Sequence, residues 1–127
     1  MSEIGVIDTI ARGLVAELPA GWREVTAVYR ATSSYAELDA DVDGAQVEVL
    51  PEGLEDHFEE LRREMYRPGK GTWLTAQLTI TSTGHFSTDF DYDGRPNWSI
   101  PVDEGIYAAD LSVFPRDDEN VPDWMRR

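Results

Sequence analysis

The stretch WLTAQLTITSTGHFSTDFDY, residues 73–92, decides the fold. Apolar and polar residues alternate along it on both sides of Thr83-Gly84, which supplies a turn. One set of alternate positions holds Leu74, Ala76, Leu78, Ile80, Phe86, Thr88, Phe90 and Tyr92. A period of two residues is typical of a β-strand with one buried face. The stretch therefore predicts a β-hairpin with strands at 73–81 and 85–92.

A second pair of strands is predicted upstream, at residues 22–31 and 34–43, around a short Thr32-Ser33 turn. In the second of these strands, Ala36, Leu38, Ala40 and Val42 alternate with Tyr35, Glu37, Asp39, Asp41 and Asp43. One face of this strand is therefore apolar and the other acidic. Gly44 follows as a turn residue, and residues 46–50 could form a short further strand.

Three helices are predicted from spacings of three and four residues. The first covers residues 3–18, with Ser2 as its N-cap and a stripe of Ile4, Ile7, Ile10, Ala11, Leu14 and Leu18. The second covers residues 54–66, with a stripe of Leu54, Phe58, Leu61 and Met65. The third is short, Asp103–Phe114, with Asp103 as a cap and with Tyr107, Leu111 and Phe114 on one face.

This order of elements indicates the α+β class. We expect an antiparallel sheet of four to five strands with helices packed on one face, which leaves the other face polar and acidic. At 127 residues the chain is long enough for one core, so residues 1–127 are predicted to form a single domain.

Composition excludes several classes of function. The chain has no cysteine, which excludes a disulfide scaffold, a thiol nucleophile and cysteine-ligated metals. Its 25 acidic and 11 basic residues give a net charge of −14. Polyanionic nucleic acid and anionic membranes are therefore disfavoured as partners, whereas a cationic protein would be attracted. No leader or membrane-spanning run is evident, so we expect a cytoplasmic protein. The acidity could instead serve solubility alone.

The pattern Asp-x-Asp-x-Asp-Gly occurs twice, at Asp39–Gly44 and Asp89–Gly94. A calcium loop of the helix–loop–helix type has this beginning but requires a glutamate at its twelfth position. That position is Leu50 in the first copy and Ile100 in the second. The pattern is more typical of turns at the ends of strands whose alternate residues face water.

Little in the sequence favours an enzyme. The two histidines, His57 and His85, belong to no metal-binding or catalytic motif, and residues 69–71 lack the spacing of a phosphate-binding loop. We therefore predict a non-enzymatic protein with no cofactor. The alternative that stays open is a calcium- or magnesium-dependent binding module, or a small hydrolase, that uses the aspartate clusters.

The aromatic residues suggest where a partner could be anchored. Trp73 begins a strand in its polar register, so its ring is predicted to be exposed beside the acidic residues. Trp22 and Trp98 are interpreted as packing residues. Trp124 is predicted to attach the C-terminal tail to the body of the protein.

Several of these motifs together resemble the YezG-like family of small bacterial immunity (antitoxin) proteins. The most specific is Phe90-Asp91-Tyr92-Asp93, followed by Trp98, Tyr107 and Phe114-Pro115-Arg116. The resemblance also includes Pro19-x-Gly-Trp22, Leu61-Arg62, Trp73 and Pro122-x-Trp124, so it extends over essentially the whole chain. Asp39–Gly44 is not part of the family pattern.

The resemblance implies a cytoplasmic α+β protein that is encoded beside a secreted polymorphic toxin, often a nuclease, and that binds the toxin domain. It implies no catalytic residues. We therefore predict an acidic surface that covers the basic cleft of a cognate toxin. The residues predicted to contact the toxin are Glu37, Asp39, Asp41, Asp89, Asp91 and Asp93, with Tyr35 or Trp73 as an aromatic anchor. A structural domain without a dedicated site is a third reading.

Overall fold

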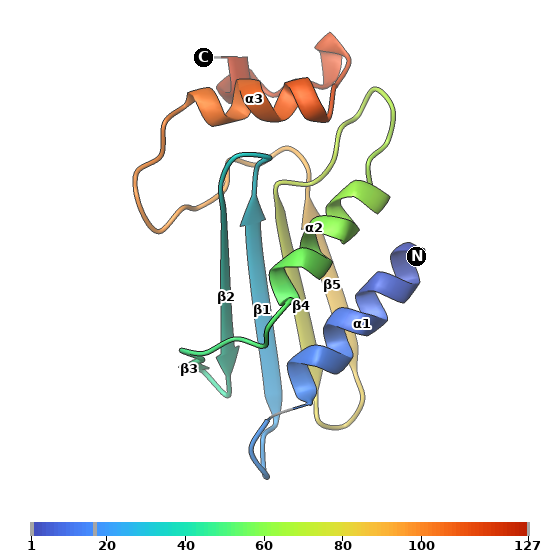
Figure 1. Ribbon diagram of the computed structural model, residues 1–127, viewed down its shortest axis with the longest axis vertical. Helices are drawn as coiled ribbons and strands as arrows, with labels where there is room; N and C mark the ends of the chain where they lie inside the picture. The colour runs from blue at the N-terminus through green and yellow to red at the C-terminus, as the bar shows by residue number, and fades with distance from the viewer. Residues whose placement is uncertain (1, 17, 127) are drawn as a thin grey trace.

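The computed structural model describes residues 2–16 and 18–126. Five strands form one sheet: β1 (Glu24–Ala31), β2 (Ala36–Val42), β3 (Ala45–Gln46), β4 (Thr75–Thr81) and β5 (Phe86–Asp91). Helices α1 (Glu3–Val15) and α2 (Leu54–Glu64) cover one face of the sheet, and α3 (Gly105–Val113) lies across one end of it (Figure 1). Two short 3₁₀ helices, Asp118–Asn120 and Asp123–Arg126, complete the chain.

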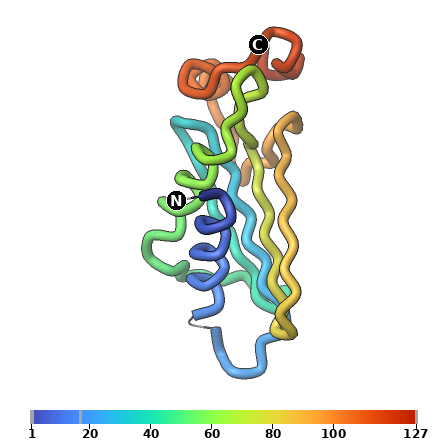
Figure 2. Tube along the Cα trace, turned by 90° about the vertical axis from the view of Figure 1, so that its right-hand side faces the viewer, coloured from blue at the N-terminus to red at the C-terminus, as the bar shows by residue number. Residues whose placement is uncertain are grey.

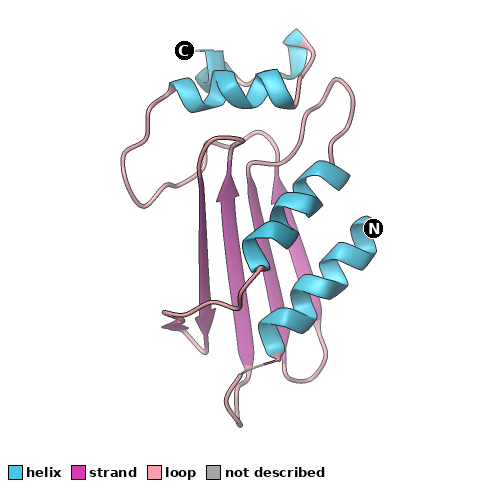
Figure 3. Cartoon of the chain, viewed as in Figure 1, coloured by secondary structure: helices cyan, strands magenta, loops and turns pink. Residues whose placement is uncertain are grey.

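The sheet is antiparallel throughout, with the strand order β3-β2-β1-β4-β5 (Figure 3). β1 lies at its centre and pairs with both β2 and β4. The hairpin that opened the sequence analysis forms as predicted, with Ile80 opposite Phe86 and Ala76 opposite Phe90. The prediction of an α+β fold with an antiparallel sheet is therefore confirmed.

The core lies between the sheet and the two helices, which Figure 2 shows on the same side of the sheet. Alternate residues of β1 and β4 point into it, and the inward stripes of α1 and α2 cover them. The buried face of α1 consists of Val6, Ile10 and Leu14. The predicted position of Ile4 on this face is wrong: its side chain is 78% exposed, because two residues along a helix turn it about 200° away from Val6.

Two predicted boundaries also change. α1 ends at Val15 with Ala16 as its C-cap, not at residue 18; residue 17 of the predicted helix lies outside the described residues. The strand expected at 46–50 is the two-residue β3, Ala45–Gln46. Val47 N–H still bonds the Ala40 carbonyl, and after it the chain leaves the sheet. Asp43 and Gly44 make the tight β2–β3 turn with φ values of 52° and 84°, which is the left-handed geometry of a two-residue hairpin loop.

The C-terminal segment packs against the end of the sheet through a second small core of Leu74, Tyr107 and Met125. α3 begins at Gly105 with Glu104 at its N-cap, so the predicted cap at Asp103 is wrong by one residue; the Asp103 carboxylate accepts the Gly105 N–H at 2.7 Å in the turn that leads into the helix. The Trp124 indole N–H donates to the Asp93 carbonyl at 2.8 Å, and its ring meets Tyr107 edge-on. The prediction that Trp124 attaches the tail is thus confirmed.

Among residues 2–16 and 18–126, no helix has both the length and the apolar character that crossing a bilayer requires.

Candidate functional site

The sheet face opposite α1 and α2 carries most of the residues predicted to contact a partner. We call it the open face. The register of the strands assigns to it alternate residues of four strands: Glu24, Thr26, Val28, Arg30, Glu37, Asp39, Asp41, Thr75, Gln77, Thr79, Ser87, Asp89 and Asp91. This set holds six carboxylates and one guanidinium, so the open face is strongly negative.

Five of the six carboxylates lie along two margins of the open face, on β2 and β5, and Glu24 begins the central strand β1. In one cross-strand row, Asp39 is opposite Val28, Val28 is opposite Gln77, and Gln77 is opposite Asp89. Three inter-strand spacings place Asp39 and Asp89 about 14 Å apart. The strip between them is neutral. The fold thus brings together two acidic clusters that are far apart in the sequence, as margins of one surface.

Arg30 neutralises part of the margin on β2. Its Nη2 donates to the Asp39 carboxylate and its Nε donates to Glu37 at 3.3 Å. The Arg30 side chain is 12% exposed, whereas that of Asp39 is 44% exposed. Asp41 and Asp89 are exposed, and no hydrogen bond or ion pair to either side chain is recorded in the part of the chain that the structure describes. These two carboxylates are therefore free for a partner.

Glu37 has a structural role, so its predicted place among the surface contacts is wrong. Its side chain is 9% exposed, and its carboxylate accepts hydrogen bonds from Ser99 N–H at 2.9 Å and from Tyr35 Oη at 2.7 Å. Burial raises the pKa of the Glu37 carboxyl, but these bonds and Arg30 outweigh it, so the pKa lies below its ordinary value. Through Ser99, Glu37 fastens the segment that follows β5 to β2.

Trp73 is also misplaced by the sequence analysis, because its ring is 0% exposed. Its indole N–H donates to Met65 Sδ at 3.3 Å, and its ring contacts those of Tyr29 and Phe90. The strand begins at Thr75, and the alternation is broken just before it: Trp73 belongs to the main core and Leu74 to the second core under α3. Because both sides of the chain are covered at this point, alternate residues no longer face water, and Trp73 is buried.

Tyr35 keeps its place at the rim of the open face. Its ring lies 5.2 Å from that of Trp98, and its hydroxyl hydrogen bond to Glu37 raises the pKa of the phenol. Trp98 also packs as predicted, because its indole N–H donates to Tyr107 Oη at 2.9 Å. The sequence analysis missed the hollow of about 440 Å³ beside it, which Trp98 lines together with Ile100, an apolar residue that is 54% exposed.

The two Asp-x-Asp-x-Asp-Gly copies use their aspartates differently. In the first, the Asp43 carboxylate accepts the backbone N–H groups of Arg23 and Glu24, at the start of β1. In the second, Asp91 accepts the N–H groups of Asp93 and Gly94, which folds the turn after β5. Among the described residues, no group of three or more His, Cys, Asp or Glu side chains is arranged to hold a metal ion.

Asp93 lies outside the open face, 82% exposed, and pairs with Arg116 at 3.3 Å. The two histidines are apart: His85 is exposed at the β4–β5 turn, and His57 on α2 lies 3.9 Å from Glu60. The structure therefore brings Asp39, Asp41, Asp89 and Asp91 onto one face with Tyr35 at its rim, and it adds Glu24, which the sequence analysis did not single out.

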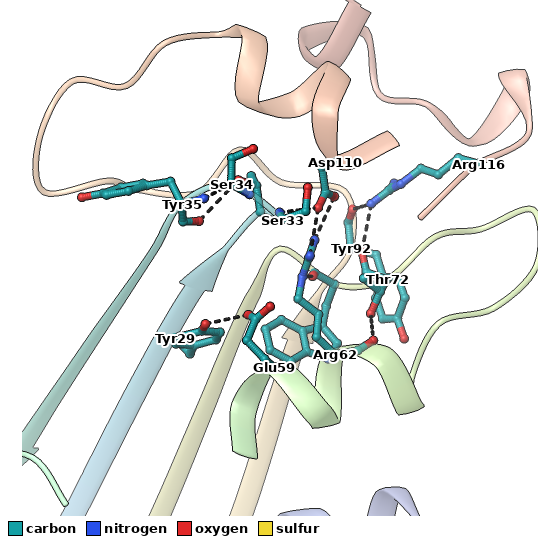
Figure 4. Close-up of polar contacts among 12 residues, drawn as sticks. Tyr29, Ser33, Ser34, Tyr35, Glu59, Arg62, Thr72, Tyr92, Asp110 and Arg116 are labelled. Carbon is teal, nitrogen blue, oxygen red and sulfur yellow. Dashed lines mark hydrogen bonds and ion pairs between the residues drawn. The ribbon is translucent and has the colours of Figure 1, made fainter. Parts of the chain in front are cut away.

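A buried polar joint connects the C-terminal segment to the sheet (Figure 4). The Arg62 guanidinium makes two bonds to the Asp110 carboxylate at 2.8 and 2.9 Å, and its Nε donates to the Trp73 carbonyl at 2.8 Å. Asp110 also accepts Ser33 N–H at 2.8 Å. Arg116 donates to the carbonyls of Tyr92 and Thr72. All of these contacts lie within the fold, so the joint is structural.

Comparison of the chain with protein-family models gives no match, and a search of curated proteins gives none either.

Proposed function

We propose that this protein is an immunity protein (antitoxin) that binds and neutralises a cognate protein toxin through its open face. The observation that carries the proposal is the placement of exposed, unpaired Asp41 and Asp89 on opposite margins of a sheet face that α1 and α2 leave uncovered. A cationic protein surface is the complement of such a face. No catalytic step is required of the protein.

A nuclease toxin would supply that surface. An enzyme that binds a phosphate backbone presents arginines and lysines along its substrate cleft. An inhibitor with a net charge of −14 is attracted by the same potential and occupies the cleft in place of the nucleic acid. The neutral strip of Thr26, Val28, Gln77 and Thr79 leaves room between the two acidic margins for contacts other than ion pairs.

The resemblance to the YezG-like family supports the same proposal. Several of its motif residues hold the C-terminal segment or the sheet: Arg62, Trp73, Tyr92, Tyr107, Arg116 and Trp124. The most specific motif also contributes Asp91 to the open face. On this proposal the protein acts in the cytoplasm of the producing cell.

The test uses the toxin domain encoded beside this protein, with the open face altered by Asp41→Lys together with Asp89→Lys. We expect the wild type to form a complex in size-exclusion chromatography and to protect cells that express the toxin, and the double variant to lose both properties. Like charges across an interface cost several kcal/mol, which corresponds to at least about a hundredfold in affinity.

The matched control is Glu55→Lys together with Glu64→Lys on α2, in the opposite layer of the molecule. It changes the net charge equally, and the two substitutions lie in the first and last turns of one helix, where their effects on the helix dipole oppose each other. The control should bind and protect like the wild type. A wild type that neither binds nor protects contradicts the proposal.

A further inference from the structure

β5, Phe86–Asp91, forms one edge of the sheet, since the strand order ends with it. Figure 2 views the molecule from this side. No strand pairs with its outer side in the part of the chain that the structure describes. An edge strand presents unpaired backbone N–H and C=O groups to any strand that approaches it.

The register identifies which groups these are. Thr81 N–H donates to the His85 carbonyl at 2.9 Å, so Thr81 and His85 form a hydrogen-bonded pair. Such pairs alternate along an antiparallel ladder. Ser87 and Asp89 therefore bond β4, whereas the backbone groups of Phe86, Thr88 and Phe90 point outward from the sheet.

This edge has part of the usual protection. Charged side chains (lysine above all), proline, bulges or a covering segment blunt most natural edges; the β5 sequence FSTDFD contains no lysine and no proline, and its charged residues are Asp89 and Asp91. The opposite edge is different: β3 pairs with Asp41 and Val42, and Val47 N–H bonds the Ala40 carbonyl. β5 therefore presents a longer stretch of unpaired backbone than the opposite edge, which ends in the two-residue β3.

The side chains along β5 define what would fit beside it. Phe86 is 47% exposed on the helix-covered side of the sheet, where Phe90 packs against the core. Asp89 and Asp91 project on the open face. A strand added to this edge would therefore place apolar residues beside Phe86 and Phe90, and cationic residues beside Asp89 and Asp91.

We propose that β5 binds its partner by strand addition, and that the partner strand alternates cationic and apolar residues. The inference rests on the proposed function for its biological partner, the toxin, and states how the toxin is held. Main-chain hydrogen bonds to Phe86, Thr88 and Phe90 would give affinity, and the alternation of side chains would give specificity. A second copy of this chain is the less suitable occupant, because each copy carries a net charge of −14.

The first test uses synthetic peptides and needs no toxin. Acetyl-KVKVKVK-amide is titrated into the isotope-labelled protein, and the backbone amides are followed by nuclear magnetic resonance. We expect the peptide to shift the resonances of Phe86, Thr88 and Phe90 and to slow hydrogen exchange at their amides, while the EVEVEVE analogue has no effect. Shifts confined to acidic residues elsewhere, or no shift along β5, overturn the proposal.

The second test removes one outward donor. Thr88→Pro deletes an N–H that β4 does not use, and edge strands tolerate proline at such positions. We expect Thr88→Pro to weaken peptide and toxin binding by about tenfold or more, and Thr88→Val to bind like the wild type. Ala36→Pro, the same change at the outward-facing start of β2, is the matched control and should also bind normally.

The outcomes separate the two proposals. If the wild type and Thr88→Pro bind the toxin equally, strand addition is wrong and the immunity function stands. If the wild type binds the KV peptide along β5 but not the toxin, the edge is a strand-binding site and the immunity function is wrong. Circular dichroism checks that Thr88→Pro folds; should it unfold, protection of the wild-type Thr88 amide decides instead. Concentration-dependent dimerisation through β5 would overturn the choice of a cationic partner.

Discussion

At the scale of single residues, the main determinant is the buried pair Arg62 and Asp110. Arg62 is 0% exposed, and its side chain donates to the Trp73 carbonyl just before β4 and to the Asp110 carboxylate on α3, while its guanidinium lies 4.9 Å from the Phe114 ring. Because Asp110 also accepts Ser33 N–H, one ion pair fixes α2, the β1–β2 turn and α3 at a single point. A buried pair of this kind tolerates the loss of both charges far better than the loss of one.

We therefore expect Asp110→Ala and Arg62→Met each to destabilise the protein by about 3–5 kcal/mol, since each leaves one buried charge or buried donor without its partner. The double variant should be clearly less destabilised than the sum of the two single variants. Urea unfolding followed by tryptophan fluorescence measures all three. Additive effects, or single variants within about 1 kcal/mol of the wild type, would show that the pair does not hold the joint.

The sequence contained half of this information. Arg62 follows Phe58 by four residues and so falls on the buried stripe of the second helix, where a charge requires a partner. Nothing local indicates that the partner is Asp110, 48 residues later. The same limit explains Glu37: its alternation with Leu38 correctly assigned it to the polar face, but only the tertiary fold shows that Ser99 covers it.

At the scale of elements, the two Asp-Gly turns have the same sequence pattern and different physics. Gly44 has φ of 84° with open space around it, so its glycine is required by the backbone. Gly94 has no left-handed φ, but a Cβ there would lie 2.4 Å from an Asp91 carboxylate oxygen. Its glycine is required by the turn that Asp91 holds.

These causes predict different couplings. Gly44→Ala should cost about 1–2 kcal/mol through its left-handed backbone, and the cost should be the same in an Asp43→Ala background. Gly94→Ala should displace the Asp91 carboxylate and cost about 1 kcal/mol or more in lost hydrogen bonds, but little in an Asp91→Ala background. Thermal unfolding of the two double-variant cycles checks this. Equal coupling in both cycles would mean that the turns share one mechanism.

Elements were predicted well where their signal is local. Both hairpins follow from the alternation of apolar residues, and α2 follows from the spacing of Leu54, Phe58, Leu61 and Met65. The errors fall where the environment changes along an element. Ile4 points away from the side of α1 that Val6 buries, and Trp73 lies just before β4, where Tyr29, Phe90 and Met65 contact its ring. Periodicity reports which residues share a face, and only packing decides which faces are covered.

At the scale of the whole molecule, one layer of helices leaves one face of the sheet without cover, and the chain places carboxylates there. The covered side and the joint account for the core residues, and the open face holds six of the 25 acidic residues, whereas α2 in the opposite layer carries five others. Part of the net charge of −14 is therefore fixed on the open face, where we propose that the toxin binds. The rest lies on other surfaces of the molecule.

The salt dependence of association separates these two contributions. We expect the association rate constant with the toxin domain to fall at least about tenfold between roughly 50 and 500 mM salt, with little change in the dissociation rate, because screening acts on long-range attraction. Asp41→Asn with Asp89→Asn should flatten this dependence. Glu55→Gln with Glu64→Gln also changes the net charge from −14 to −12, by removing two carboxylates. This pair should keep most of the salt dependence, because α2 lies on the opposite side of the sheet from the open face. Stopped-flow mixing measures both pairs. If the two pairs flatten the dependence equally, the total charge attracts the toxin and the open face has no special part in its approach.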